Sequence, residues 1–131
     1  MAEATQRLRR YLDDELGECR DEDVDRRLDE LSALESALGA ERVEAELGVL
    51  SALASETRYT LVRVLVAADG ELCVCELDAL VDVSESGLSH ALSALVDAGL
   101  VDSRKDGRWK KYRATNRAVA LLTVLEGAVD E

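Results

Sequence analysis

The sequence predicts a mainly α-helical protein with one small β-hairpin near its C-terminus. Apolar residues recur at spacings of three and four through most of the 131 residues. The period drops to two only around the Asp106-Gly107 pair, and two helical segments joined by a tight turn come just before it. This order of elements is that of a winged helix-turn-helix, here preceded by an N-terminal helical extension.

Residues 1–42 are expected to form an acidic helical extension. Two apolar stripes lie at helical spacing, one before Gly17 and one before Gly39, and these glycines are expected to end the helices. The stripes comprise Leu8, Tyr11, Leu12 and Leu16, then Val24, Leu28, Leu31, Leu34 and Leu38. Narrow stripes flanked by charges suit a partner helix, so the extension is expected to dimerise or to cover the next domain. A frayed acidic arm is the alternative.

Residues 43–131 are expected to form the second domain, beginning with two helices. Residues 41–53 carry the apolar positions of one helix and residues 59–66 those of the next. Ser55 stands at the N-cap position, where its hydroxyl can accept a free backbone N–H. Asp69-Gly70 is expected to end the second helix.

The helix-turn-helix and the wing follow. Residues 76–81 predict a short helix, and Ser84 predicts the N-cap of a longer helix that stops at Gly99. Residues 100–105 and 108–114 alternate as two strands about the Asp106-Gly107 turn. A last helix carries apolar residues that could pair with a symmetry mate. These residues are Ala118, Leu121, Leu122, Leu125 and Val129.

The charge is unevenly distributed. The net charge of −12 would argue against a nucleic-acid partner, but residues 104–117 hold seven bases and one acid. The rest of the chain is acidic. Residues 1–50 hold 15 acids and 7 bases, and residues 51–103 hold 9 acids and 2 bases. Few lysines, no Phe, and abundant Asp, Glu, Ala and Val resemble the proteins of salt-accumulating halophiles; an ordinary acidic surface is the alternative.

Double-stranded DNA is the expected partner. The first turns of the second helix of a helix-turn-helix reach base edges in the major groove, and basic residues of the wing neutralise phosphates. The candidate helix residues are Ser84, Ser86, Gly87, Ser89 and His90. The candidate wing residues are Arg104, Lys105, Arg108, Lys110 and Lys111. A merely capped helix and a solvated strand edge are the alternatives, and Tyr112 is expected to pack beneath the wing.

Four segments resemble the ArsR family of winged-helix repressors over about residues 43–128. They are ELCVCEL (71–77), SESGLSHAL (84–92), AGLV (98–101) and GRWKKYR (107–113). The resemblance implies a homodimer that occupies an operator until an effector releases it. Gly87 and Ala91 replace longer or polar residues of the family, so base preference is not carried over.

The resemblance also implies an effector site at Cys73 and Cys75, which stand in the family's Cys-Val-Cys motif for arsenite or antimonite. Side chains at positions i and i+2 point to the same side only where the backbone is extended. Binding of one ion by both thiols therefore favours a non-helical start to the following helix. Distorting that helix would move the recognition helix. The third cysteine that such members carry shortly afterwards is absent, which leaves Cys19 as the candidate third ligand. Two packed thiols, a redox switch and cadmium are alternatives.

The sequence thus predicts a cytoplasmic, homodimeric transcriptional repressor with no obligatory cofactor. Neither a signal peptide nor a membrane span is expected, since the most apolar run, residues 59–68, is broken by Arg63. The family's zinc site on the last helix is not expected, because residues 116–131 contain no His. An enzyme is not expected, because His90 has no evident nucleophile and base around it. An adaptor whose basic hairpin binds a protein is the competing function.

Overall fold

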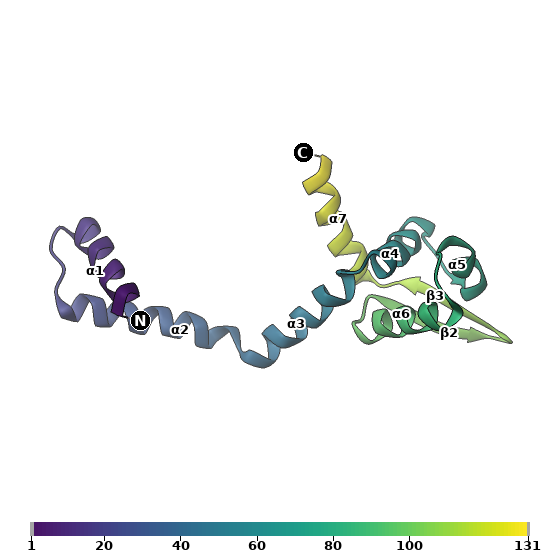
Figure 1. Ribbon diagram of the computed structural model, residues 1–131, viewed down its shortest axis with the longest axis horizontal. Coiled ribbons are helices and arrows are strands. Elements are labelled where there is room, and N and C mark those ends of the chain that lie inside the picture. Colours follow the sequence, from purple (N-terminus) through teal and green to yellow (C-terminus); the bar gives the residue numbers. More distant parts are fainter. Residues whose placement is uncertain (1, 131) are drawn as a thin grey trace. The chain divides into compact units, whose positions relative to one another are not determined.

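The computed structural model describes residues 2–130, without the side chains of Ala2 and residues 128–130. Two compact units comprise residues 1–43 and 44–131. The helices are α1 (Ala2–Leu16), α2 (Asp21–Leu38), α3 (Ala40–Leu53), α4 (Glu56–Ala68), α5 (Val74–Leu80), α6 (Glu85–Asp97) and α7 (Asn116–Asp130). The strands are β1 (Leu72–Cys73), β2 (Val101–Asp106) and β3 (Trp109–Ala114) (Figure 1). The side chain of Val129, expected on the apolar face of the last helix, lies outside the described residues.

In the first unit, α1 and α2 end directly before Gly17 and Gly39, as the sequence predicted. Gly17 and Gly39 have φ angles of 80° and 74°, a conformation that other residues rarely adopt. Leu12 and Val24 are buried. The rest of the α2 stripe stays exposed, by 39% at Leu28 up to 64% at Leu34. The two helices of the extension are confirmed, and its role remains a prediction.

The helices of the second unit begin and end through local caps. The Ser55 hydroxyl accepts the backbone N–H of Arg58, as expected of an N-cap, and α4 ends at Asp69 in the left-handed conformation. The Ser84 hydroxyl likewise accepts the N–H of Gly87 at 3.0 Å and starts α6. Gly99, at φ 73°, follows α6. Helix α5 starts at Val74, two residues earlier than expected, because Cys73 caps it.

The sheet contains a strand that the sequence did not predict. Its order is β1-β3-β2, and the two residues of β1 pair with Tyr112 and Lys111 of β3. In the wing, Asp106 pairs with Trp109, so the turn residues are Gly107 and Arg108 rather than Asp106 and Gly107. Glycine with positive φ at the first turn position is the requirement of a type II′ hairpin.

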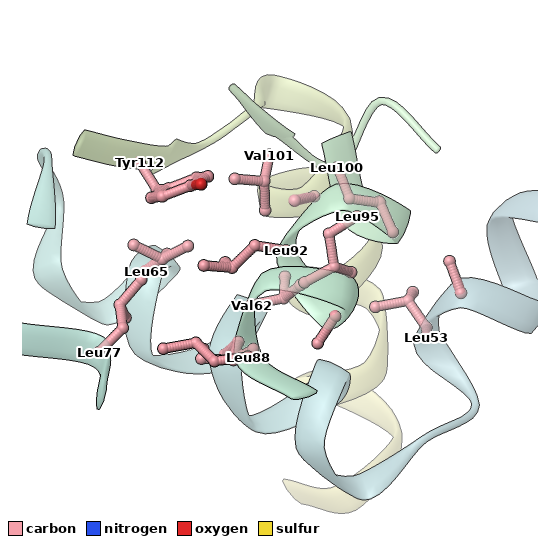
Figure 2. Packing of buried hydrophobic residues seen from close by; sticks show 14 of the residues in the cluster. Leu53, Val62, Leu65, Leu77, Leu88, Leu92, Leu95, Leu100, Val101 and Tyr112 are labelled. Atoms are coloured by element: carbon pink, nitrogen blue, oxygen red, sulfur yellow. The ribbon is translucent and has the colours of Figure 1, made fainter. Parts of the chain in front are cut away.

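One core joins the helix-turn-helix to the sheet. Figure 2 shows leucines of α4, α5 and α6 pointing toward Val101 and Tyr112 of the wing strands. Leu77, Leu88 and Leu92 are at most 1% exposed. The wing and the recognition helix α6 are therefore held by the same apolar contacts. Within the described residues, no helix is both long and apolar enough to cross a membrane.

Candidate DNA-binding surface and thiol site

The two cysteines of the Cys-Val-Cys motif lie on either side of the start of α5. Cys73 is the last residue of β1 and has extended backbone, with φ −70° and ψ 149°. Cys75 is the second residue of α5. Because the chain passes from strand to helix between them, the sulfurs lie on one side, 2.7 Å apart. Cys73 is buried, whereas Cys75 is exposed.

The thiols are inequivalent. The Cys75 thiol donates a hydrogen bond to the Cys73 sulfur, which lowers the pKa of Cys73 and raises that of Cys75. The Cys75 backbone N–H also donates to the Cys73 sulfur, at 3.3 Å. The Glu76 carboxylate accepts the backbone N–H of Cys73 at 2.9 Å and completes a capping box. Cys73 is thus the more acidic thiol of the pair, and thiolate is the form that binds soft metals.

The thiol pair is connected to both elements expected to contact DNA. Cys73 is the cross-strand partner of Lys111 in the wing. Leu77, half a turn after Cys75, lies in the same core cluster as Leu88 of α6. The start of α5 is therefore joined to the wing through the β1–β3 ladder and to α6 through the shared core.

The predicted recognition residues lie at the N-terminal end of α6. Ser86, Ser89 and His90 are exposed, so their polar groups can reach another molecule. Ser84 is exposed too, although its hydroxyl already caps the helix. Gly87 is half-buried, and a Cβ there would lie 3.2 Å from the Ser84 hydroxyl oxygen. The glycine thus fits a tightly capped first turn.

The predicted wing bases, taken together with Arg113 of β3, fall into two groups. Arg104 donates to both Glu71 carboxylate oxygens at 2.7 Å, and the Lys111 ammonium lies 2.9 Å from Asp106. These pairs lower the pKa of Glu71 and Asp106. The other bases are exposed and make no ion pair within the described residues: Lys105, Arg108, Lys110 and Arg113.

The two wing aromatics have different surroundings. Tyr112 is buried at 6% exposure and belongs to the core cluster, as expected. Trp109 is 46% exposed near the hairpin tip, and the Arg108 guanidinium lies 4.9 Å from its ring centre. The Arg108 guanidinium and the indole thus form a cation–π contact at the exposed end of the wing.

Cys19 lies in the first unit, between α1 and α2. It is half-buried, its backbone N–H donates to an Asp13 carboxylate oxygen at 3.0 Å, and burial raises the pKa of its thiol. Among residues 2–130, no three His, Cys, Asp or Glu side chains cluster in a way that could hold a metal ion. Cys19 as third ligand remains a prediction.

Sequence reasoning missed Glu71 and Asp106 as partners of the wing bases. Asp106 lies at the predicted hairpin turn, whereas Glu71 precedes β1, whose pairing with β3 brings it to Arg104, 33 residues away. A charge pattern alone offered no signal for that pairing, since β1 was not expected.

Comparison with known proteins decides the family. Residues 55–103 match the family described as "Bacterial regulatory protein, arsR family". A Halobacterium salinarum protein with the provisional name of arsenical resistance operon repressor ArsR is 57% identical over 125 residues. The alignment covers 95% of this chain and 97% of that protein. The chain belongs to the ArsR family. The alignment is long enough to include most of the N-terminal extension of this ArsR regulator.

Solved structures share the winged-helix fold of this ArsR regulator. HlyU from Vibrio cholerae superposes with a TM-score of 0.61 and 28% identity, over 70% of this chain and 99% of HlyU. The homodimeric winged helix-turn-helix DNA-binding domain of Mb0332 from Mycobacterium bovis superposes with a TM-score of 0.60 and 28% identity. The match covers 71% of this chain and 84% of that one. The predicted fold class is confirmed.

Proposed function

We propose that this ArsR-family transcriptional regulator is a homodimeric repressor, which arsenite or antimonite releases from its operator by binding Cys73 and Cys75. The observation that carries the proposal is the 2.7 Å separation of the two sulfurs, next to both predicted DNA-contacting elements. The names of the relatives support the effector class: the Halobacterium salinarum protein and an Escherichia coli protein are both named as arsenical resistance operon repressors.

Operator binding is assigned to α6 and the wing. The exposed Ser86, Ser89 and His90 would face the major groove, while Lys105 and Lys110, opposite each other in the hairpin, would face phosphates. The acidic composition of the rest of the chain supports this assignment to α6 and the wing. A strongly negative protein can bind DNA only through a surface that is locally positive.

Two exposed apolar helix faces of the second unit support the homodimer. Leu47 and Leu50 of α3 are 58% and 56% exposed, and Val124 of α7 is 72% exposed. A mostly apolar groove of about 370 Å³ lies between these helices, lined by Val49, Leu50 and Leu121 among others. Exposed apolar faces of this kind are covered in a two-fold assembly, and the Mycobacterium bovis neighbour is described as homodimeric.

Release follows from the geometry of the thiols. Trivalent arsenic binds its ligands as a pyramid, and two sulfurs held at about 2.3 Å, the length of a zinc–thiolate bond, with an angle above about 90° lie more than 3 Å apart, farther than the pair lies here. Binding therefore separates the sulfurs and removes the hydrogen bond from Cys75 to Cys73. The capping box of α5 and the pairing of Cys73 with Lys111 are the contacts strained first. Cys19 is proposed as a third sulfur ligand for the inorganic ions.

The test is titration of the protein–DNA complex with arsenite. Reduced protein is bound to the DNA upstream of its own gene in KCl, and anisotropy follows release by the wild type and by Cys73→Ser/Cys75→Ser. Release of the wild type alone supports the proposal. Complexes that ignore arsenite in both proteins would refute it.

A redox switch is the second candidate, favoured by the short distance between the two sulfurs. Oxidation would join them in a disulfide, whose sulfurs lie about 2.05 Å apart. Peroxide that releases DNA from the wild type, where arsenite does not, would select this function over the first.

A further inference from the structure

We infer that Trp109, at the tip of the wing, contacts the operator directly and packs its indole ring against the sugars of the duplex. This inference rests on the operator binding proposed for α6 and the wing. It adds an apolar contact to the phosphate contacts assigned to the wing bases, and this contact supplies affinity that does not depend on salt.

The end of the wing stands clear of the helices of the second unit. Figure 1 shows the hairpin of β2 and β3 projecting beyond α5 and α6. Trp109 is the first residue of β3, next to the turn, and it is 46% exposed. It is not a member of the core cluster, to which Tyr112 of the same strand belongs. Packing of the core therefore does not account for an indole at this position.

The two faces of the hairpin differ in charge. Side chains alternate along a strand, and cross-strand partners share a face. Lys105 and Lys110 are partners on the face that also carries the buried Tyr112, and neither lysine makes an ion pair within the described residues. Trp109 lies on the opposite face, with its partner Asp106. The lysine face is the one that suits phosphates.

On the face that carries Trp109, the charges next to the ring are neutralised in pairs. Arg104 donates to Glu71 at 2.7 Å, and the Lys111 ammonium lies 2.9 Å from Asp106. Two bases and two acids leave no net charge there, so this part of the wing offers little attraction to a phosphate. A neutral surface with an exposed indole instead suits the carbon atoms of deoxyribose, to which proteins also bind in duplex DNA.

The stacked arginine favours DNA over an apolar protein surface as the occupant. The Arg108 guanidinium lies 4.9 Å from the centre of the Trp109 ring and makes no ion pair within the described part of the chain. An unpaired cation is costly to bury in an apolar interface. Beside a duplex, the same cation is neutralised by phosphate while the indole packs on the adjacent sugar.

The charge of the chain makes an apolar contact valuable. The net charge is −12, so DNA is attracted only at the wing, and that attraction weakens as salt rises. Burial of apolar surface is not screened by ions. The share of affinity that remains in concentrated KCl is therefore expected to depend on Trp109.

The test uses Trp109 as its own probe, because the chain contains no other tryptophan. Quenching of its fluorescence by acrylamide, a neutral molecule, is measured for the reduced full-length protein alone and in complex with the DNA upstream of its gene. Affinity for that DNA is measured by anisotropy over a series of KCl concentrations. The proteins are the wild type, Trp109→Ala, Trp109→Phe and, as the matched control, Arg108→Ala, each checked for folding by circular dichroism.

Acrylamide quenching is expected to fall several-fold when DNA binds. Trp109→Ala is expected to bind about tenfold more weakly at every KCl concentration, with an unchanged salt slope, because only apolar surface is lost. Trp109→Phe is expected to keep most of the affinity. Arg108→Ala is expected to lower the slope by about 0.9 per protomer, because a charge is lost.

An indole that is as accessible to acrylamide in the complex as in the free protein would overturn the inference, and this result requires no variant. Wild-type affinity in Trp109→Ala would overturn it too. A Trp109→Ala variant that reproduces the smaller salt slope of Arg108→Ala would show that Trp109 only positions Arg108, which also contradicts a direct contact.

The two proposals fail differently. If the wild type binds the upstream DNA and arsenite releases it, but Trp109 stays accessible in the complex, the inference alone is wrong. If the wild type does not bind that DNA, the proposed function is wrong and the inference falls with it.

Discussion

Removing two opposed lysines from the wing should weaken the salt dependence of DNA binding by a calculable amount. Lys105 and Lys110 are cross-strand partners, both are exposed, and neither makes an ion pair within the described part of the chain. Lys111, by contrast, is held by Asp106, so it is the poorer choice. Lys105→Ala/Lys110→Ala removes two like charges that face each other, and the fold should not lose stability.

The magnitude follows from counterion release. Each phosphate neutralised contributes about 0.9 to the slope of log affinity against log salt, so two lysines contribute about 1.8 per protomer. Between 50 and 200 mM salt, the wild type should lose about 12-fold more affinity per protomer than the variant, and about 150-fold more if both wings of a dimer bind.

Fluorescence anisotropy on the upstream DNA, over a series of KCl concentrations, measures both slopes. Arg7→Ala/Arg10→Ala is the matched control, because it removes two exposed bases from α1, and its slope should equal that of the wild type. A lysine variant that binds DNA with an unchanged slope would refute the assignment of the wing to phosphates. Loss of folded structure in the variant, detected by circular dichroism, would contradict the expected stability and would show that the Lys110 ammonium, 5.7 Å from the Tyr112 ring centre, supports the fold.

Four further outcomes are expected. Gly99→Ala should destabilise the protein by about 1–2 kcal/mol in urea unfolding, because φ is 73° and the new Cβ would lie 2.9 Å from Arg117 Nη1; no loss would contradict this backbone. Leu88→Ala should cost about 2–5 kcal/mol, since the side chain is 1% exposed; a cost below 1 kcal/mol would argue against this core. Glu71→Gln should raise DNA affinity a few-fold by freeing Arg104, with a stability change under about 1 kcal/mol, and weaker binding would show that the ion pair positions the wing. If the composition reflects a salt-rich cytosol, molar KCl should raise the melting temperature, and full stability without salt would defeat that hypothesis.

The helices and the hairpin could be predicted because their signals are local. Gly17 and Gly39 end helices through their own backbone freedom, and the hydroxyls of Ser55 and Ser84 cap helices through bonds three residues away. The wing was also predictable, although its turn lies one residue later than expected, at Gly107 and Arg108. Periodicity and caps act within one or two turns of chain, so the sequence alone contains them.

The tertiary structure decided what lies next to what. Strand β1 has two residues, too few to show a period, and it exists because β3 pairs with it. That pairing brings Glu71 to Arg104 and places Cys73 beside Lys111 of the wing, whereas the two sulfurs meet because the chain passes from β1 directly into α5. From sequence, Cys73 and Cys75 were candidate ligands in a motif. Their closeness to the wing and to α6 comes from contacts between residues far apart in the chain, which no local pattern records.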